Sequence, residues 1–537
     1  MLHQSACCYS MKYRRLFVLF AILAVTFGTL RVGGQTERDS NTPISVTSSP
    51  DSLIIIGTNE WVPIIYTFTN HTDGNIRIRD RLAYFLSFDR DVKTANGPLA
   101  TSLRVPPHSI AMFPDKAYFP STLIQAFQKA DAIKSGSFLF VQTFTAALDS
   151  TRTYSVAVPV RVDVVSYPPT VAHVSKSAIP TEVSLNKGAG QGDALYLTLR
   201  LNERDELLFV VDTGSAFTIL DQSVVTKLGN AIGATLLEDG NDGKQKPLAC
   251  FKAPSLYLGK TLLRTADWVT AWDLSLFRQV SGRPVMGILG MDCLIHYCIQ
   301  LDCDAGKLRF LDPDHPGDEA SGKVFPLTTL GDGRCAVSEN LMDVEGVRTL
   351  IDTGFVGTGS LQSNLFAQAI NDARIHSDFA RYASFSGIGE SREGRFARCI
   401  LGGQTYRNLI LHEAKTTFLG LDFLARHRVT LNFPKLEMYL KRRTTELADD
   451  ESGMSGLSII RNGEATVVNS VDRDGPAERA GVKAGDVVLK VNSRPAKELE
   501  LWEIRKMLAA GDGKEVRFTV QRASKTKRFT IVLKRKL

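Results

Sequence analysis

Two segments of this chain repeat one pattern, an apolar strand that runs directly into Asp-Thr-Gly. The first copy, at 209–220, reads FVVDTGSAFTIL, and the second, at 349–361, reads TLIDTGFVGTGSL. A single match to so short a motif is weak evidence, because three residues recur by chance in a long chain and need a structural context. Two copies, each after a strand of buried character, constrain the fold much more strongly. They predict two related β-rich units within one chain.

A second pair of segments supports this duplication. GILGMDCLIHYCIQLDC at 287–303 follows the first motif, and TFLGLDFLARHRVTLNF at 417–433 follows the second. When Gly290 is aligned with Gly420, the remainder of the two segments aligns without a gap. We therefore interpret 181–441 as a tandem repeat of one β-rich unit.

The two copies resemble the retropepsin-like and pepsin-like aspartic proteases, in which two β-rich lobes each donate one Asp-Thr-Gly to a shared cleft. This resemblance covers about half of the chain. It implies a bilobal acid-protease β fold, with lobe 1 at 181–314 and lobe 2 at 323–441, and the activity of an aspartic endopeptidase. Retroviral enzymes must dimerise to bring two motifs together, whereas this chain carries both. A monomeric active site is therefore expected.

The chemistry of such a site follows from two adjacent carboxylates. Like charges held close together cannot both ionise and so share one proton, which leaves one base to activate water and one acid to polarise a carbonyl. Asp212 and Asp352 are the predicted catalytic residues. This chemistry requires no cofactor, and none is predicted. No metal is predicted either, because Cys293, Cys298 and Cys303 lack the two-residue spacing that is typical of zinc sites.

Five residues are expected to support the pair: Thr213, Gly214, Ser215, Thr353 and Gly354. Gly214 and Gly354 allow each aspartate to reach the floor of the cleft, where a side chain would obstruct the approach. The resemblance implies that Thr213 and Thr353 link the two loops by hydrogen bonds.

The residues that follow the two motifs differ. Ser215 follows the first and offers a hydroxyl that could donate to Asp212, whereas Phe355 follows the second and has no side-chain donor. A hydrogen bond to the charged form of a carboxyl favours ionisation. We therefore predict that Asp352 has the higher pKa and holds the shared proton.

The region 36–170 is rich in strand patterns and turns. Its clearest strand, TYSVAVPVRVDVV at 153–165, places valines on one face and mostly polar residues on the other. Pro159 on the outer face suggests an edge strand, since proline cannot donate to a neighbouring strand. The region resembles bacterial immunoglobulin-like (Ig-like) domains, which implies a β-sandwich for placement or adhesion, or a rigid spacer. A linker follows at 166–180.

The N-terminus has the composition of a targeting segment. Lys12, Arg14 and Arg15 precede the apolar run at 16–30, which has about the length of a signal-peptide core. We interpret 1–34 as a signal peptide, with an uncleaved N-terminal membrane anchor as the alternative. The protein is therefore expected to be exported, to the periplasm or the outside of the cell.

The last segment, 452–537, resembles a bacterial-type PDZ domain, an α+β module. Its first strand would follow a Gly-Leu carboxylate-binding loop, and LELWEIRKML at 499–508 would be the groove helix. Such domains add an extended peptide to a sheet edge and hold its C-terminal carboxylate by backbone amides. The predicted peptide-binding residues are Gly456, Leu457, Ser458 and Ile459. The acidic stretch 444–453 would be a hinge.

Charge excludes one class of partner. The net charge is +7, and 451–537 alone holds 18 Lys and Arg against 11 Asp and Glu. No basic stripe interleaved with aromatic residues is present, so nucleic acid is not expected. The expected partners are protein or peptide substrates, peptide C-termini at the PDZ domain and, if the leader is retained, a membrane.

The sequence as a whole predicts a mainly β protein with an N-terminal Ig-like β-sandwich, a bilobal pepsin/retropepsin-like unit and a C-terminal PDZ domain. The predicted function is an exported aspartic endopeptidase that hydrolyses peptide bonds with an aspartate pair and activated water. The alternative is a catalytically silent, protease-like adaptor that binds peptides through its PDZ and sandwich domains.

Overall fold

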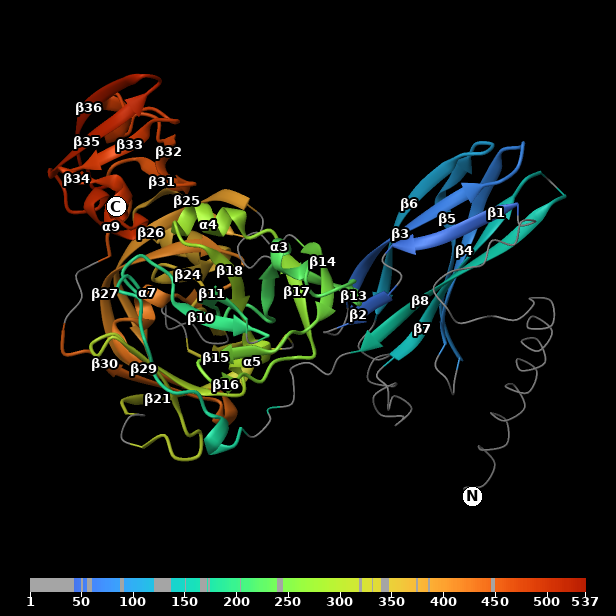
Figure 1. Ribbon diagram of the computed structural model, residues 1–537, viewed down its shortest axis with the longest axis horizontal. Coiled ribbons are helices and arrows are strands. Elements are labelled where there is room, and N and C mark those ends of the chain that lie inside the picture. The colour runs from blue at the N-terminus through green and yellow to red at the C-terminus, as the bar shows by residue number, and fades with distance from the viewer. Residues whose placement is uncertain are drawn as a thin grey trace.

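The computed structural model is mainly β, as predicted, and places its sheets in an elongated row (Figure 1). It describes residues 43–537, except for 50–51, 56–59, 87–90, 120–136, 150, 165–170, 172–173, 203, 239–244, 318–320, 331, 340–346, 373–374, 385–386 and 446–449. The leader at 1–34 lies outside the described residues, as does the first part of the linker at 166–180, except for residue 171. Within the described part of the chain, no helix has both the length and the apolar character needed to cross a bilayer.

The N-terminal region forms two sheets that share one core. The smaller sheet has the order β1-β3-β6 and the larger β2-β8-β7-β4-β5. Phe144 of the larger sheet lies edge-on to Tyr66 and Phe68 of the smaller, with ring centroids 4.9 and 5.0 Å apart. The strands are β1 (Ile44–Ser49), β2 (Ser52–Ile55), β3 (Glu60–Asn70), β4 (Ile76–Leu86), β5 (Asp91–Val105), β6 (Ile110–Phe119), β7 (Ser137–Ala147) and β8 (Thr153–Val164).

Strand β8 has the predicted alternation but not the predicted position. Val158, Val160 and Val162 are buried in the shared core. β8 nevertheless lies between β2 and β7, so the prediction of an edge strand was wrong. The reason is the shortness of β2, which pairs with β8 only from Arg161 onward, so the pairing on that side does not require the amide hydrogen that Pro159 lacks.

The central region repeats one strand arrangement twice. In the first copy β11 (Asp205–Val211) pairs in parallel with β18 (Val285–Leu289), which pairs antiparallel with β12 (Ile219–Asp221). In the second copy β23 (Thr349–Ile351), β28 (Phe418–Leu419) and β24 (Gly359–Gln362) repeat these pairings. We call the sheet regions around β11 and β23 lobe 1 and lobe 2.

The two lobes are joined by strand pairing and by a common core. β19 (Cys298–Asp302) follows the first copy, β29 (His427–Asn432) follows the second, and the two strands pair antiparallel with Ile299 opposite Leu431. Buried apolar residues of both lobes form one continuous cluster. A further cluster around Phe217 and Trp268 lies within lobe 1 alone, so the lobes share their main core while lobe 1 adds one of its own.

The remaining elements complete the two large sheets and their connections. The strands are β9 (Val183–Ser184), β10 (Tyr196–Leu201), β13 (Gly233–Glu238), β14 (Gln245–Lys252), β15 (Leu256–Leu258), β16 (Thr261–Leu262), β17 (Trp268–Trp272), β20 (Lys307–Leu311), β21 (Lys323–Thr329), β22 (Cys335–Val337), β25 (Ser377–Ser384), β26 (Gly387–Leu401), β27 (Gln404–Ala414) and β30 (Glu437–Arg442). The helices are η1 (Lys176–Ala178), α3 (Gln222–Val225), α4 (Ser275–Ser281), α5 (Met291–Leu294), α6 (Ser363–Asn371), α7 (Leu421–Leu424) and η3 (Phe433–Lys435).

The C-terminal region folds as a sheet with one long helix against it. The sheet order is β31-β32-β33-β35-β36, so β31 is an edge strand. Leu501, Ile504 and Leu508 of α9 (Leu501–Leu508) are buried in the core of this region. The other elements are β31 (Leu457–Asn462), β32 (Ala465–Val471), α8 (Pro476–Arg479), β33 (Val487–Val491), β34 (Arg494–Pro495), η4 (Ala496–Glu498), β35 (Glu515–Arg522) and β36 (Lys525–Val532).

The described end of the predicted hinge is fastened to lobe 2. Asp450 accepts a hydrogen bond from the Ile410 amide at 2.9 Å and pairs with Arg426. Glu451 pairs with Arg395 of β26 at 3.2 Å. These ion pairs fix the C-terminal end of the 444–453 segment, so the prediction that it is a free hinge was wrong for that end.

Candidate functional site

The structure brings the two Asp-Thr-Gly loops together. Each aspartate directly follows a central strand, and its amide bonds to the parallel neighbour: Asp212 to the Leu289 carbonyl at 3.0 Å and Asp352 to the Leu419 carbonyl at 2.9 Å. In both loops the backbone amides of the second and third residues after the aspartate donate to its Oδ1 at 2.8–3.0 Å. The donors are Gly214 and Ser215 for Asp212, and Gly354 and Phe355 for Asp352.

The glycines of the motifs pack directly on the opposite carboxyl group. A Cβ at Gly214 would lie 2.4 Å from Cγ of Asp352, and a Cβ at Gly354 would lie 2.2 Å from Cγ of Asp212. Neither distance is sterically possible. The two glycines are therefore what allows the two carboxyl groups to face each other across the lobes.

Reciprocal threonine hydrogen bonds hold the two loops in this position. Oγ1 of Thr213 donates to the Ile351 carbonyl at 2.7 Å, and Oγ1 of Thr353 donates to the Val211 carbonyl at 2.8 Å. Each threonine hydroxyl also accepts from the backbone amide of the other threonine, at 3.0 and 3.1 Å. Both side chains are buried. Four hydrogen bonds thus link the lobes at the site.

The predicted role of Ser215 was wrong. Its hydroxyl donates to the carbonyl of Phe217 at 2.9 Å and not to Asp212. The tight turn after the motif brings that carbonyl within reach of the hydroxyl, while the aspartate is already served by backbone amides. The two carboxyl groups therefore receive equivalent local hydrogen bonds, and Ser215 does not distinguish them.

The two aspartates differ in their electrostatic surroundings because of an arginine that the motif did not predict. Arg334, just before β22, pairs with Asp332 and reaches the Gly214 carbonyl at 3.4 Å. Burial raises the pKa of both Asp212 and Asp352, and the Arg334 charge opposes this rise at Asp352. The Arg334 charge thus favours the ionised form of Asp352, whereas the sequence predicted that Asp352 holds the shared proton. Arg334 lies far from both motifs in sequence, so local spacing carried no signal for it.

The geometry defines what the pair can do chemically. Asp212 and Asp352 each keep part of their surface accessible. The repulsion between two close carboxylates, together with burial, favours the state with one shared proton. Such a site offers one acid and one base side by side. No cluster of three or more His, Cys, Asp or Glu suited to a metal ion occurs among the residues that the structure describes.

The residues predicted to bind peptide lie where β31 begins. Gly456 has a φ of 68°, in the left-handed region that favours glycine, and its carbonyl accepts from the Asp472 amide at 2.8 Å. Leu457 and Ser458 open the edge strand and are half-buried, and Ile459 is buried. The loop therefore turns sharply into an edge strand that has α9 beside it.

Comparisons with known proteins find similarity in this C-terminal part. The PDZ domain model matches residues 467–522. A probable CtpA-like serine protease of Staphylococcus aureus is 33% identical over 100 residues, which are 18% of this chain and 20% of that protein. The corresponding protein of Staphylococcus haemolyticus is 29% identical over 104 residues, or 19% of this chain and 21% of the relative.

A solved structure, the photosystem II D1 C-terminal processing protease, is similar over a small share of the chain. It is 27% identical, with a TM-score of 0.15, over 16% of this chain and 24% of its own. The chain spans about a fifth of the length of the curated relatives it matches. The C-terminal region is thus a PDZ domain, and the PDZ domain together with these relatives supports the binding of peptides or proteins.

These findings correct the family prediction. The relatives found are CtpA-like serine proteases and not retropepsin-like or pepsin-like aspartic proteases. The predicted aspartic endopeptidase activity, its enzyme class and its aspartyl-protease description are wrong for the same reason. The prediction failed because it took a family and a mechanism from two short motifs, and an acid and a base side by side do not by themselves define a class of enzyme.

Proposed function

We propose that this protein binds extended polypeptide segments, and C-termini in particular, through its PDZ domain at Gly456, Leu457, Ser458 and Ile459. The observation that carries the proposal is the position of β31. It is an edge strand, it follows a left-handed glycine turn, and α9 lies beside it.

This arrangement has the two parts that strand addition requires. An edge strand offers unpaired backbone groups to an extended peptide, and a helix beside it forms the other wall of the groove. The Gly456 amide donates to the Gly453 carbonyl at 3.5 Å and the Leu457 amide to Oγ of Ser455 at 3.2 Å, and a terminal carboxylate would replace these two acceptors. The relatives are named as proteases, one of them a C-terminal processing protease, and this favours a polypeptide ligand here.

Fluorescence anisotropy with the full chain tests this function. The probe is a short fluorescein-labelled peptide that ends in Val-Leu with a free carboxylate, and the same peptide with an amidated end is its control. We expect the free acid to bind and amidation to weaken it at least ~10-fold, since a carboxylate held by backbone amides contributes ~1.5–3 kcal/mol. Equal affinity for both peptides would refute recognition of the C-terminus.

A matched pair of glycine variants locates the binding. Gly456→Val places a branched residue at a φ of 68° in the turn and should abolish the carboxylate preference. Gly463→Val creates the same strain at a φ of 58° in the β31–β32 turn, where an added Cβ meets no atom within 4 Å. It should bind like the parent.

We also propose that Asp212 and Asp352 form the chemical centre of the two lobes, with Thr213, Gly214, Thr353 and Gly354 holding them in place. Their shared proton, their partial exposure and their mutual support favour acid–base work on a bound ligand. Ser215 contributes through its backbone amide alone.

For the chain as a whole we propose the division expected from sequence. Residues 1–34 would be a signal or anchor that directs export, and 36–170 an Ig-like sandwich, which its two sheets around one core favour. Residues 181–314 and 323–441 would be the lobes of a pepsin-like fold that is complete in one chain, and 452–537 the PDZ domain. Fold and function are separate proposals here.

A further inference from the structure

Helix α4 of lobe 1 lies across the groove of the PDZ domain. It packs against both walls, the edge strand β31 and the helix α9. Arg505 of α9 joins the three elements, because its Nη2 donates to the carbonyl of Val280 in α4 and reaches the carbonyl of Ile459 in β31 at 3.4 Å. One guanidinium therefore bridges the C-terminal end of α4 and the strand to which a peptide would be added.

Gly282, which ends α4, fits between the two walls. It has a φ of 72° and closes the helix by donating to the Arg278 carbonyl at 2.8 Å. A Cβ at this position would lie 3.1 Å from Cγ of Leu501 in α9 and 3.7 Å from Cβ of Arg461 in β31. The end of α4 thus packs closely between α9 and β31.

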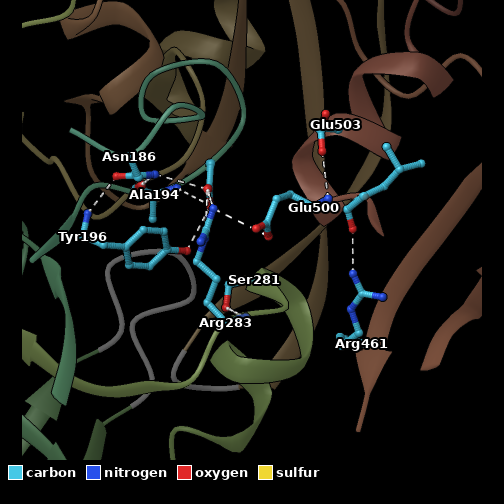
Figure 2. Close-up of polar contacts among 10 residues, drawn as sticks. Asn186, Ala194, Tyr196, Ser281, Arg283, Arg461, Glu500 and Glu503 are labelled. Atoms are coloured by element: carbon cyan, nitrogen blue, oxygen red, sulfur yellow. Dashed lines mark hydrogen bonds and ion pairs between the residues drawn. The ribbon is translucent and has the colours of Figure 1, made fainter. Parts of the chain in front are cut away.

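Arg283, the residue after Gly282, connects lobe 1 to the PDZ domain. It pairs with Asp193 of lobe 1 at 3.1 Å and with Glu500, the N-cap of α9, at 3.6 Å. Its guanidinium also lies 5.2 Å from the centroid of the Tyr196 ring. Figure 2 shows Arg283 between Tyr196 and Glu500, on the seam between lobe 1 and the PDZ domain.

The outer face of α9 is also covered by lobe 1. Trp502 is only 8% exposed, and its indole ring lies 2.7 Å from the position of a Cβ on Gly188. Lys506 donates to Oε1 of Gln191 at 3.1 Å. Because α9 is held from outside and α4 lies between it and β31, the groove walls cannot separate freely.

We propose that α4, with Gly282 and Arg283, is an internal occupant of the PDZ groove that a polypeptide ligand must displace. The inference rests on the proposed peptide binding at β31. Docked α4 keeps the groove closed, so the apparent affinity for a peptide is the intrinsic affinity reduced by the fraction of open molecules. Ligand binding would release α4 from the PDZ domain.

Two glycine variants of the full chain test the inference. Gly282→Val forces a branched residue into a left-handed position beside Leu501 and should push α4 out of the groove. Gly259→Val introduces the same strain at a φ of 61° elsewhere in lobe 1, where an added Cβ meets no atom within 4 Å. With the Val-Leu probe we expect Gly282→Val to bind ~10-fold more tightly than the parent, and Gly259→Val to match the parent.

Hydrogen exchange supplies a second measurement. Saturation of the parent with the probe should speed exchange in the segment 275–283, and Arg283→Ala should do so without a ligand. Circular dichroism confirms that each variant is folded, and Arg283→Ala provides the affinity test if Gly282→Val is not.

The outcomes separate the two proposals. Equal, tight binding by the parent and all variants would refute the closed groove and leave peptide binding intact. Binding that leaves exchange at 275–283 unchanged would also refute displacement of α4. If no protein binds the probe although exchange shows α4 released in the variants, the groove is not a peptide site, and both proposals fail.

Discussion

Replacement of Thr353 by valine tests the hydrogen bonds that join the lobes at the carboxylate pair. Valine has the shape of threonine but lacks the hydroxyl, so the packing of this side chain, which is 2% exposed, is retained. Two hydrogen bonds are lost, and the Val211 carbonyl and the Thr213 amide are left buried without their partner.

The structure sets the size of the expected effect. Each buried group left without a partner costs ~1–3 kcal/mol, so with two such groups Thr353→Val should lower the free energy of local opening by ~2–6 kcal/mol. Thr213→Val should cost a similar amount by the symmetry of the loops. Each variant removes a different two of the four hydrogen bonds, but loops loosened by one variant hold the other two less well, so the double variant should cost less than the sum.

Hydrogen exchange in the segments 209–215 and 349–355 measures this local free energy. The method avoids a single unfolding transition, which a chain of several domains need not show. Thr198→Val on the exposed face of β10 is the control and should change the free energy of opening by less than ~0.5 kcal/mol. A Thr353→Val effect as small as this control, or strict additivity with Thr213→Val, would refute the reasoning.

Three further perturbations probe the same site. Gly354→Ala places a Cβ against Asp212 and should lower the melting temperature by several degrees. Gly453→Ala is the control, because an added Cβ there meets no atom within 4 Å, and it should leave the melting temperature unchanged. Equal melting temperatures of the two variants would contradict the packing described. Burial raises the pKa of Asp212 from its unfolded value of 3.8 to about 8. The folded state therefore binds more protons than the unfolded state between these two pH values, and it loses stability as the pH rises from one to the other. Asp212→Asn should remove this loss of stability. If the melting temperature falls by the same amount between pH 4.5 and 7.5 in the parent and in the variant, the role of Asp212 is disproved. Arg334→Met removes the cation that lowers the pKa of Asp352, so the infrared band of the protonated carboxyl should persist to higher pH than in the parent or in Arg407→Met on the exposed side of β27.

Local patterns predicted the elements but not the relations between distant ones. The mainly β class, the alternation of Val158, Val160 and Val162 and the PDZ domain could all be read from residues close together in sequence. The edge-strand prediction for β8 failed because strand order depends on β2, whose short pairing begins only at Arg161. Strand order is a property of the sheet and not of the strand.

The carboxylate pair shows the same limit. Sequence placed Asp212 and Asp352 after equivalent strands, and the threonine hydrogen bonds follow from that equivalence. It assigned their difference to the adjacent Ser215, whereas the charge that separates them belongs to Arg334, which the β21–β22 connection brings to the Gly214 carbonyl. A long-range contact of one side chain produces no periodic pattern in the sequence, so sequence reasoning could not predict it.

The position of α4 gives the groove and the carboxylate pair a structural connection. Arg278 of α4 bonds to the buried Asp221 at the end of β12 and to the Val285 carbonyl at the start of β18, at 2.6 and 3.1 Å. β18 then pairs with β11, and the next residue after β11 is Asp212. A ligand that displaces α4 from the PDZ domain therefore acts on a helix that is bonded to β12, the strand after the first Asp-Thr-Gly loop, and to β18, which pairs with the strand before that loop. The groove and the carboxylate pair are thus linked through one connected set of elements. This connection favours a ligand whose binding at the PDZ domain affects Asp212.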